Sequence, residues 1–158
     1  MEPMKEWLLR GFDYDLWANL EWFAAKERLQ DTTHASEILH HVLAAQLAWH
    51  DRIMGYIDAN TAKFGTVDLS EGALEQANAL WKTVVTRTDL AVQVTSKRSD
   101  GLTYTFSVGD IARHVLNHGT YHRGHLRGLA DAQALEDFPE TDWTAWMRTT
   151  GQAGPVEA

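Results

Sequence analysis

The sequence predicts an all-α protein built as a four-helix bundle, and three observations carry this prediction. Proline occurs only at positions 3, 139 and 155, which leaves residues 4–138 free of the strongest helix breaker. Apolar residues recur at steps of three and four along four long segments, as they do on a helix with one buried face. At 158 residues and 44% hydrophobic composition, the chain is large enough to bury one core without disulfides.

The first two helices are predicted over residues 5–28 and 33–58. The apolar residues of each segment fall on one helical face, so both helices are expected to pack with that face inward. These residues are Leu9, Phe12, Leu16, Leu20 and Phe23 in the first helix, and Ile38, Val42, Ala45, Trp49 and Ile53 in the second.

The third helix is predicted over residues 68–91. It is expected to begin with a capping box, in which the Asp68 carboxylate accepts hydrogen bonds from early backbone N–H groups and Glu71 reaches back. Its inward residues are Leu74, Ala77, Trp81, Val84 and Thr88.

A small β-hairpin-like segment is predicted before the fourth helix. Residues 92–95 and 103–106 alternate with period two, and the intervening Asp100-Gly101 pair is a turn signal. Ser107 and Asp110 then form a second capping-box pattern, from which the fourth long helix is expected to run to about Gln133.

The last predicted elements follow Pro139. A short helix is expected over residues 142–148, and the small, polar residues 151–158 are expected to form a disordered tail. No repeat or shift in composition marks a boundary, so residues 1–150 are predicted to form a single domain.

Composition excludes several classes of function. A net charge of −8 argues against capture of nucleic acid or of an anionic membrane surface. No apolar run approaches the roughly 18 residues of a membrane span, and charges interrupt the N-terminal segment, unlike a signal peptide. We therefore expect a cytoplasmic protein. The absence of cysteine excludes disulfides, thiolate metal sites and a cysteine nucleophile.

Histidine is the distinctive residue type, since the chain has eight and four of them lie between positions 114 and 125. His118 and His122 fall on the predicted inward stripe of the fourth helix. Residues four apart lie about 40° from one another around the helix axis and one turn apart along it. Two imidazoles at this spacing can direct nitrogen atoms at one point, as in many histidine metal sites.

A third ligand is expected from the second helix, which carries His40, His41 and His50. Helical periodicity places His41 on the inward stripe, whereas His40 is turned away from it and His50 lies on a flank. Three imidazoles in an apolar bundle would each need a hydrogen-bond partner, and one divalent cation would satisfy all three. A polar core patch or a surface stripe is the alternative interpretation. A set of three neutral ligands leaves open coordination positions, which is the catalytic rather than the structural pattern.

Three further residues on the fourth helix are expected near this site. His114 lies four residues before His118 and is turned towards the solvent side of the helix. It either orients the ligands or faces solvent. His125 is expected at the rim of the pocket. Arg123 belongs to a basic side with Arg113 and Arg127, which forms a solvated face or a dimer contact unless Arg123 binds an anionic substrate group. His34 and His50 are expected to be exposed.

The residues also resemble the DinB-like (DinB/YfiT) superfamily. The resemblance is carried by Trp17-Ala18-Asn19, by His41 and the residues that follow it, and by the segment Asn117-His-Gly-Thr-Tyr-His-Arg-Gly124. It covers roughly residues 5–148. One departure is that the family often has Gln where this chain has His125, which leaves the surroundings of the site open at that position.

The resemblance implies an up-down-down-up four-helix bundle in which His41, His118 and His122 hold a divalent metal, often nickel or zinc. It further implies a homodimer and, in some members, a transferase that joins a low-molecular-weight thiol of the bacillithiol or mycothiol type to an electrophile. Two alternatives stay open: a hydrolase that uses metal-bound water, and a non-catalytic metal-binding protein of the stress response. Aromatic residues at bundle spacing are expected in the core rather than in a ligand pocket.

Overall fold

The computed structural model describes residues 2–58, 60 and 63–155. The chain is mostly helical with one small antiparallel sheet, as predicted. Its elements are α1 (Pro3–Ala25), a 3-10 turn (Lys26–Arg28), α2 (Thr32–Ile57), α3 (Glu71–Arg87), β1 (Gln93–Lys97), β2 (Thr103–Ser107), α4 (Val108–Ala132) and α5 (Trp143–Thr149). In the predicted tail, residues 151–155 form no helix or strand, and residues 156–158 lie outside the described part.

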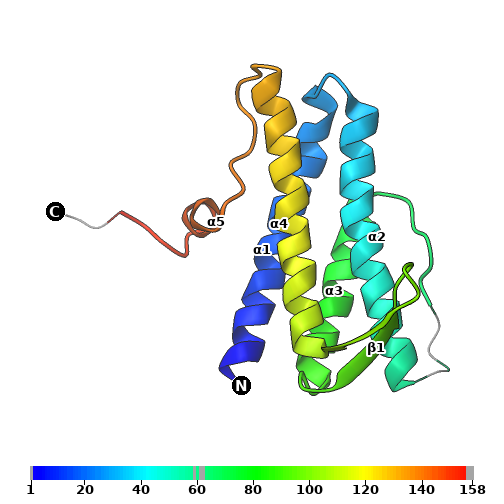
Figure 1. Ribbon diagram of the computed structural model, residues 1–158. Helices are drawn as coiled ribbons and strands as arrows, with labels where there is room; N and C mark the ends of the chain where they lie inside the picture. The colour runs from blue at the N-terminus through cyan, green and yellow to red at the C-terminus, as the bar shows by residue number, and fades with distance from the viewer. Residues whose placement is uncertain (1, 59, 61–62, 156–158) are drawn as a thin grey trace.

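The four long helices lie side by side, with α1 and α4 running in one direction and α2 and α3 in the other (Figure 1). Helices α1 and α2 each pack against both α3 and α4. Trp22, Trp81 and Phe12 are the largest fully buried side chains between them, and Trp81 stacks on Phe12. The expectation that aromatic residues at bundle spacing form core is confirmed for these three.

Helix α5 stands apart from the four long helices and packs along the flank of α1 (Figure 1). Trp143 and Trp146 of α5 surround Tyr14 of α1, with ring centroids 5.2 and 5.9 Å from the tyrosine ring. The Tyr14 hydroxyl donates a hydrogen bond to the Thr141 carbonyl at 2.7 Å. The segment before α5 is thereby fixed to the first helix.

The helix starts confirm one predicted cap and correct another. Ser107 caps α4, because its Oγ accepts from the Asp110 N–H at 3.0 Å. Asp68 was expected to cap α3, but that expectation is wrong. The helix begins at Glu71 and is capped by Ser70, whose Oγ accepts from the Ala73 N–H at 3.1 Å. A serine directly before the first helical residue offers the same acceptor two residues closer to the helix.

The hairpin between α3 and α4 forms as predicted. Strand β1 pairs antiparallel with β2, and Val94 lies opposite Phe106. Gly101 has a φ of 82°, which an L-residue with a side chain rarely adopts, so the turn needs glycine there. The strands pack against α2 and α4 and cross the lower half of α2 in Figure 1. No helix in the described part of the chain is both long and apolar enough to span a membrane.

A buried polar network joins α1, α2 and α4. The Arg123 guanidinium donates to Asp15 at 2.6 Å and to Asn19 at 2.7 Å, and the Gln46 side chain donates to Asp15 at 2.6 Å. All four residues are at most 3% exposed. The expectation that Arg123 belongs to a solvated basic face is therefore wrong. A charge at this depth is stable only with a partner, and Asp15 on α1 supplies it.

Gly119 of α4 allows this network to form. A Cβ atom at this position would lie 2.5 Å from Asp15 Oδ1 and 2.9 Å from Arg123 Nη1. These distances leave no room for a methyl group, so α4 can approach α1 closely only where it carries glycine.

We predict that Gly119→Ala lowers the free energy of unfolding by about 2 kcal/mol, because the added methyl group forces Asp15 and Arg123 apart. Gly128→Ala on the same helix is the matched control, since a Cβ there meets nothing within 4 Å. The control should raise the free energy of unfolding by about 0.5–1 kcal/mol through helix propensity. Urea denaturation of both variants measures the difference. Equal effects of the two substitutions would contradict the close packing described here.

Candidate metal centre

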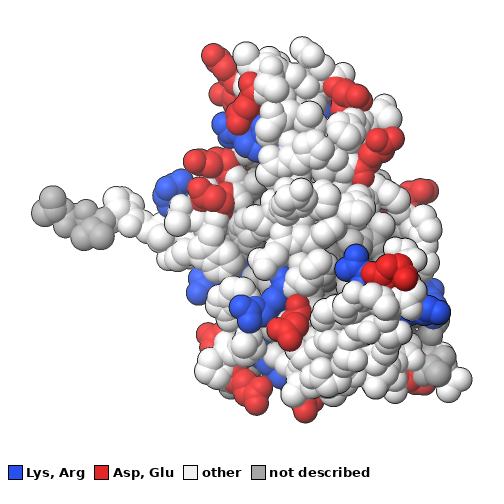
Figure 2. Space-filling model, viewed as in Figure 1, with Lys and Arg blue, Asp and Glu red and all other residues white. Residues whose placement is uncertain are grey.

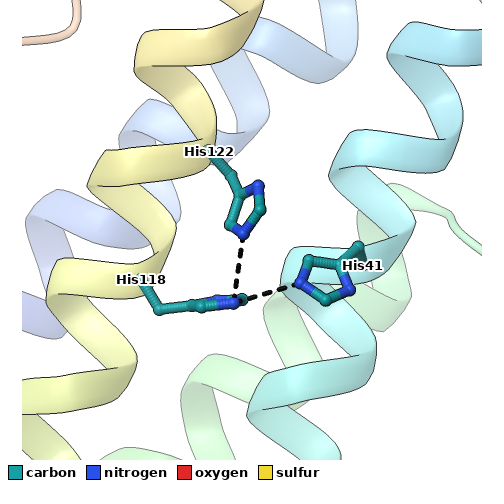
Figure 3. Close-up of side chains that lie close together, drawn as sticks. All are labelled: His41, His118 and His122. Carbon is teal, nitrogen blue, oxygen red and sulfur yellow. Dashed lines mark hydrogen bonds between the residues drawn. The ribbon is translucent and has the colours of Figure 1, made fainter.

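Three imidazoles converge between α2 and α4. His41 comes from α2, and His118 and His122 come from successive turns of α4, with the three rings turned towards one another (Figure 3). His118 Nε2 lies 3.1 Å from His41 Nε2 and 3.2 Å from His122 Nε2. One nitrogen atom of each residue lies within 4.8 Å of those of the other two. The structure therefore brings together the three histidines that the sequence singled out.

The chemistry of these nitrogen atoms fits a cation better than hydrogen bonds. An imidazole nitrogen carries either one N–H or one in-plane lone pair, so His118 Nε2 can make only one ordinary hydrogen bond. It has two short contacts, and both partners are also Nε2 atoms. Ligand nitrogens about 2.0–2.1 Å from a tetrahedral zinc ion lie about 3.3 Å apart, which is close to both observed distances. This donor set could hold one divalent metal ion.

The three histidines lie at the edge of the core rather than within it. His118 and His122 are partly buried and His41 is exposed. The sequence placed all three on the inward stripe, so the expected depth is wrong for His41. The buried positions of α4 next to them belong to Gly119 and Arg123, which face α1. The site consequently opens to solvent along the seam of α2 and α4.

Burial and the neighbouring imidazoles lower the pKa of two of these histidines. The pKa of His118 is lowered to about 4, mainly by burial and then by the neighbouring His122, His41 and His114. Burial, His41 and His125 also lower the pKa of His122 from its ordinary value. His118 is thus unprotonated at neutral pH and presents a lone pair, which is the form that a metal ion requires.

Of the three residues expected near the site, His114 and His125 lie beside it, whereas the Arg123 guanidinium does not reach it. The His114 ring packs 5.7 Å from His118, between that residue and Trp49. His125 packs against His34 with ring centroids 5.4 Å apart, one turn beyond His122. The Arg123 guanidinium instead points to α1 and the buried network.

The remaining histidines of α2 have structural partners. The His40 ring lies within hydrogen-bond distance of the Val67 carbonyl, at 3.0 Å. His50 was expected to be exposed, and this is wrong, since only 5% of its surface is accessible. His50 Nδ1 lies 3.2 Å from Asp51, whose carboxylate also accepts from the N–H groups of Phe64 and Gly65. These contacts hold the segment after α2 against the helix.

Sequence reasoning missed Asp15 and Gln46. Asp15 stands one helical turn before Asn19, whose side chain donates to it at 3.0 Å. A carboxylate and an amide four residues apart on an otherwise apolar helical face were the signal available. Gln46 offered none, because a lone glutamine among apolar residues is common on helices.

We predict that the metal-free protein loses stability as the pH falls from about 6.5 to about 4. In this range the unfolded chain protonates His118 near the ordinary pKa of about 6.5, while the folded protein resists protonation. The unfolded state then binds more protons, so the free energy of unfolding falls with decreasing pH. His118→Gln should flatten this dependence, measured by urea denaturation at several pH values. The control His34→Gln should keep the slope of the wild type. A wild-type slope in His118→Gln would refute this origin.

Comparison with known proteins shows the family of the chain. The sequence profile of the DinB family matches residues 19–132. Protein DinB of Bacillus subtilis (strain 168) is 24% identical over 176 aligned positions, which cover 93% of this chain and 97% of that protein. No solved structure matches the chain. Since the family match covers well over half of the residues, including all three converging histidines, the protein belongs to the DinB family.

Proposed function

We propose that this protein is a metal-dependent transferase that joins a low-molecular-weight thiol to an electrophile, with His41, His118 and His122 holding the metal. The observation that carries the proposal is the double contact of His118 Nε2, which two hydrogen bonds do not explain and a shared cation does. Zinc and nickel both suit a set of imidazole ligands. A divalent cation bound there would favour the thiolate form of a thiol near neutral pH.

The three histidines suit this role through charge and access. Neutral imidazoles do not cancel the charge of the ion, and the low pKa of His118 keeps it in the binding form. In the reaction, the thiol releases its proton to solvent and its sulfur forms a bond to the electrophilic carbon. The leaving group then departs with its electron pair. The partial exposure of the site gives both substrates a route from solvent.

The surroundings of the site favour thiol transfer over hydrolysis. A hydrolase of this kind uses a free carboxylate as general base beside the metal. Within the described part of the chain, the residues that cluster as possible metal ligands are histidines alone. Asp15, a buried carboxylate of α1, is held by Arg123, Asn19 and Gln46.

We also propose that the long helices form the up-down-down-up bundle of DinB-like proteins. The helix directions in Figure 1 and the packing of α1 and α2 against both α3 and α4 support this topology. In such a bundle α2 and α4 are antiparallel neighbours. This topology accounts for the position of His41 of α2 opposite His118 and His122 of α4.

Metal analysis tests the ligand assignment. We predict that purified wild-type protein carries about one divalent ion per chain, and that His41→Ala, His118→Ala and His122→Ala each lose most of it. His34→Ala is the matched control, because this residue lies on α2 outside the cluster and should keep full occupancy. Full occupancy in all three ligand variants would sink the assignment.

Thiol dependence tests the reaction. The metal-loaded protein should accelerate loss of the electrophile monobromobimane only when a thiol is present, and a chelator should abolish the acceleration. His118→Ala should behave like the chelated protein. Metal-dependent ester hydrolysis without thiol would instead support the hydrolase. Full metal occupancy without either activity would support a non-catalytic metal-binding protein.

A further inference from the structure

A cavity lies beside the histidines, between α2, α4 and the hairpin. Its volume is about 560 Å³, which is within the range of pockets that bind small molecules. Trp49, Phe106 and Ile111 form an apolar wall, and the Trp49 and Phe106 rings meet edge to face at 6.2 Å. Arg52, Lys97 and Arg98 also line the cavity.

The charge of this cavity is opposite to that of the whole chain. Three cations gather here in a protein of net charge −8. Among the described residues, no carboxylate lies within 4.0 Å of the Arg52 or Lys97 nitrogen atoms, and Arg98 has only a loose pair with Asp100 at 3.7 Å. The one carboxylate of the lining, Asp110, accepts a hydrogen bond from the Ser107 hydroxyl at the start of α4. Two cations are therefore left to bind an anion.

His114 lies between the cavity and the three converging histidines. This residue lines the cavity, and its ring packs 5.7 Å from that of His118. Trp49 packs on the other side of His114, at 5.8 Å, and the Arg52 guanidinium lies 4.4 Å from the Trp49 ring centroid. A chain of contacts thus leads from the metal ligands to the cationic end of the cavity.

Figure 2 shows how charged side chains are distributed on this face of the molecule. On the face that carries α4 and α2, acidic side chains gather mainly towards the upper and lower ends, and much of the middle is white. Neighbouring blue and red side chains interrupt the white surface where Figure 1 shows the tip of the hairpin. An anion approaching this part of the face meets less repulsion than at either end.

We infer that this cavity binds the carboxylate end of an anionic thiol whose sulfur lies at the histidine site. Arg52 and Lys97 pair with the carboxylate, and the Trp49 and Phe106 wall covers the carbon skeleton. The inference rests on the proposed function for the thiol, but the anion site stands on the cavity itself. An anion site accounts for the cations that line the cavity between the hairpin and the histidines.

A series of three thiols tests the inference with metal-loaded protein. 2-Mercaptoethanol carries no carboxylate, glutathione monoethyl ester carries one and glutathione carries two. In the double variant Arg52→Gln/Lys97→Gln, we expect the KM for glutathione to rise about tenfold, with the KM for 2-mercaptoethanol and the kcat values nearly unchanged. Arg113→Gln is the matched control, because this exposed arginine of α4 is outside the cavity lining. An equal KM for glutathione in the wild type and the double variant would overturn the anion site.

A binding measurement separates this inference from the proposed reaction. Succinate has no sulfur, so calorimetry of its binding to metal-loaded protein reports the anion site without turnover. We expect the double variant to bind succinate about tenfold more weakly than the wild type and Arg113→Gln, with unchanged metal content and melting temperature. Equal succinate affinity in all three proteins would overturn the inference. Loss of turnover with every thiol, together with the expected succinate result, would reject only the transferase.

Discussion

The buried ion pair between Asp15 and Arg123 is the interaction on which the rest of the structure depends. Both side chains are at most 2% exposed, and removing either partner would strand a charge in the core. The pair therefore fixes how close α4 lies to α1 and how it is rotated. Asn19 and Gln46 complete the network, so α2 is tied to the same point. The orientation of the two helices that carry the histidines follows from this contact rather than from the histidines themselves.

The surroundings of the candidate metal centre are set by the surface of α4 that does not face α1. One face of α4 packs against α1 and the adjacent face packs against α2. The hairpin covers the lower end of the seam between α2 and α4 (Figure 1). His118 and His122 lie in the open part of the seam, and His114 lies at its junction with the hairpin. The three histidines and the cationic cavity are thus neighbours that share His114. The histidine site suits a soft sulfur donor, and the cavity suits a hard anionic group.

Much of this arrangement could be predicted from the sequence, because helical periodicity is a local property. It located the four long helices and the three histidines that converge, while period-two alternation located the hairpin and a capping-box pattern located the Ser107 cap. It erred at His41 and Arg123, since periodicity gives direction around an axis but not the distance to the neighbouring helix. It also left out Asp15, whose burial depends on a partner 108 residues away. The cation cavity was equally inaccessible, because its residues come from three separate elements.

The two surfaces of α4 are built from consecutive residues, which limits how the helix can rotate. His118 precedes Gly119 and His122 precedes Arg123, so each histidine of the candidate site is followed, 100° around the axis, by a residue that faces α1. The helix therefore carries two alternating sets of residues, one at the histidine site and one facing α1. Rotation of α4 would move both sets of residues at once, so the arrangement of the histidines and the core contact are fixed together. Because Gln46 ties α2 to the same buried network, rearrangement beside the histidines must come from the hairpin.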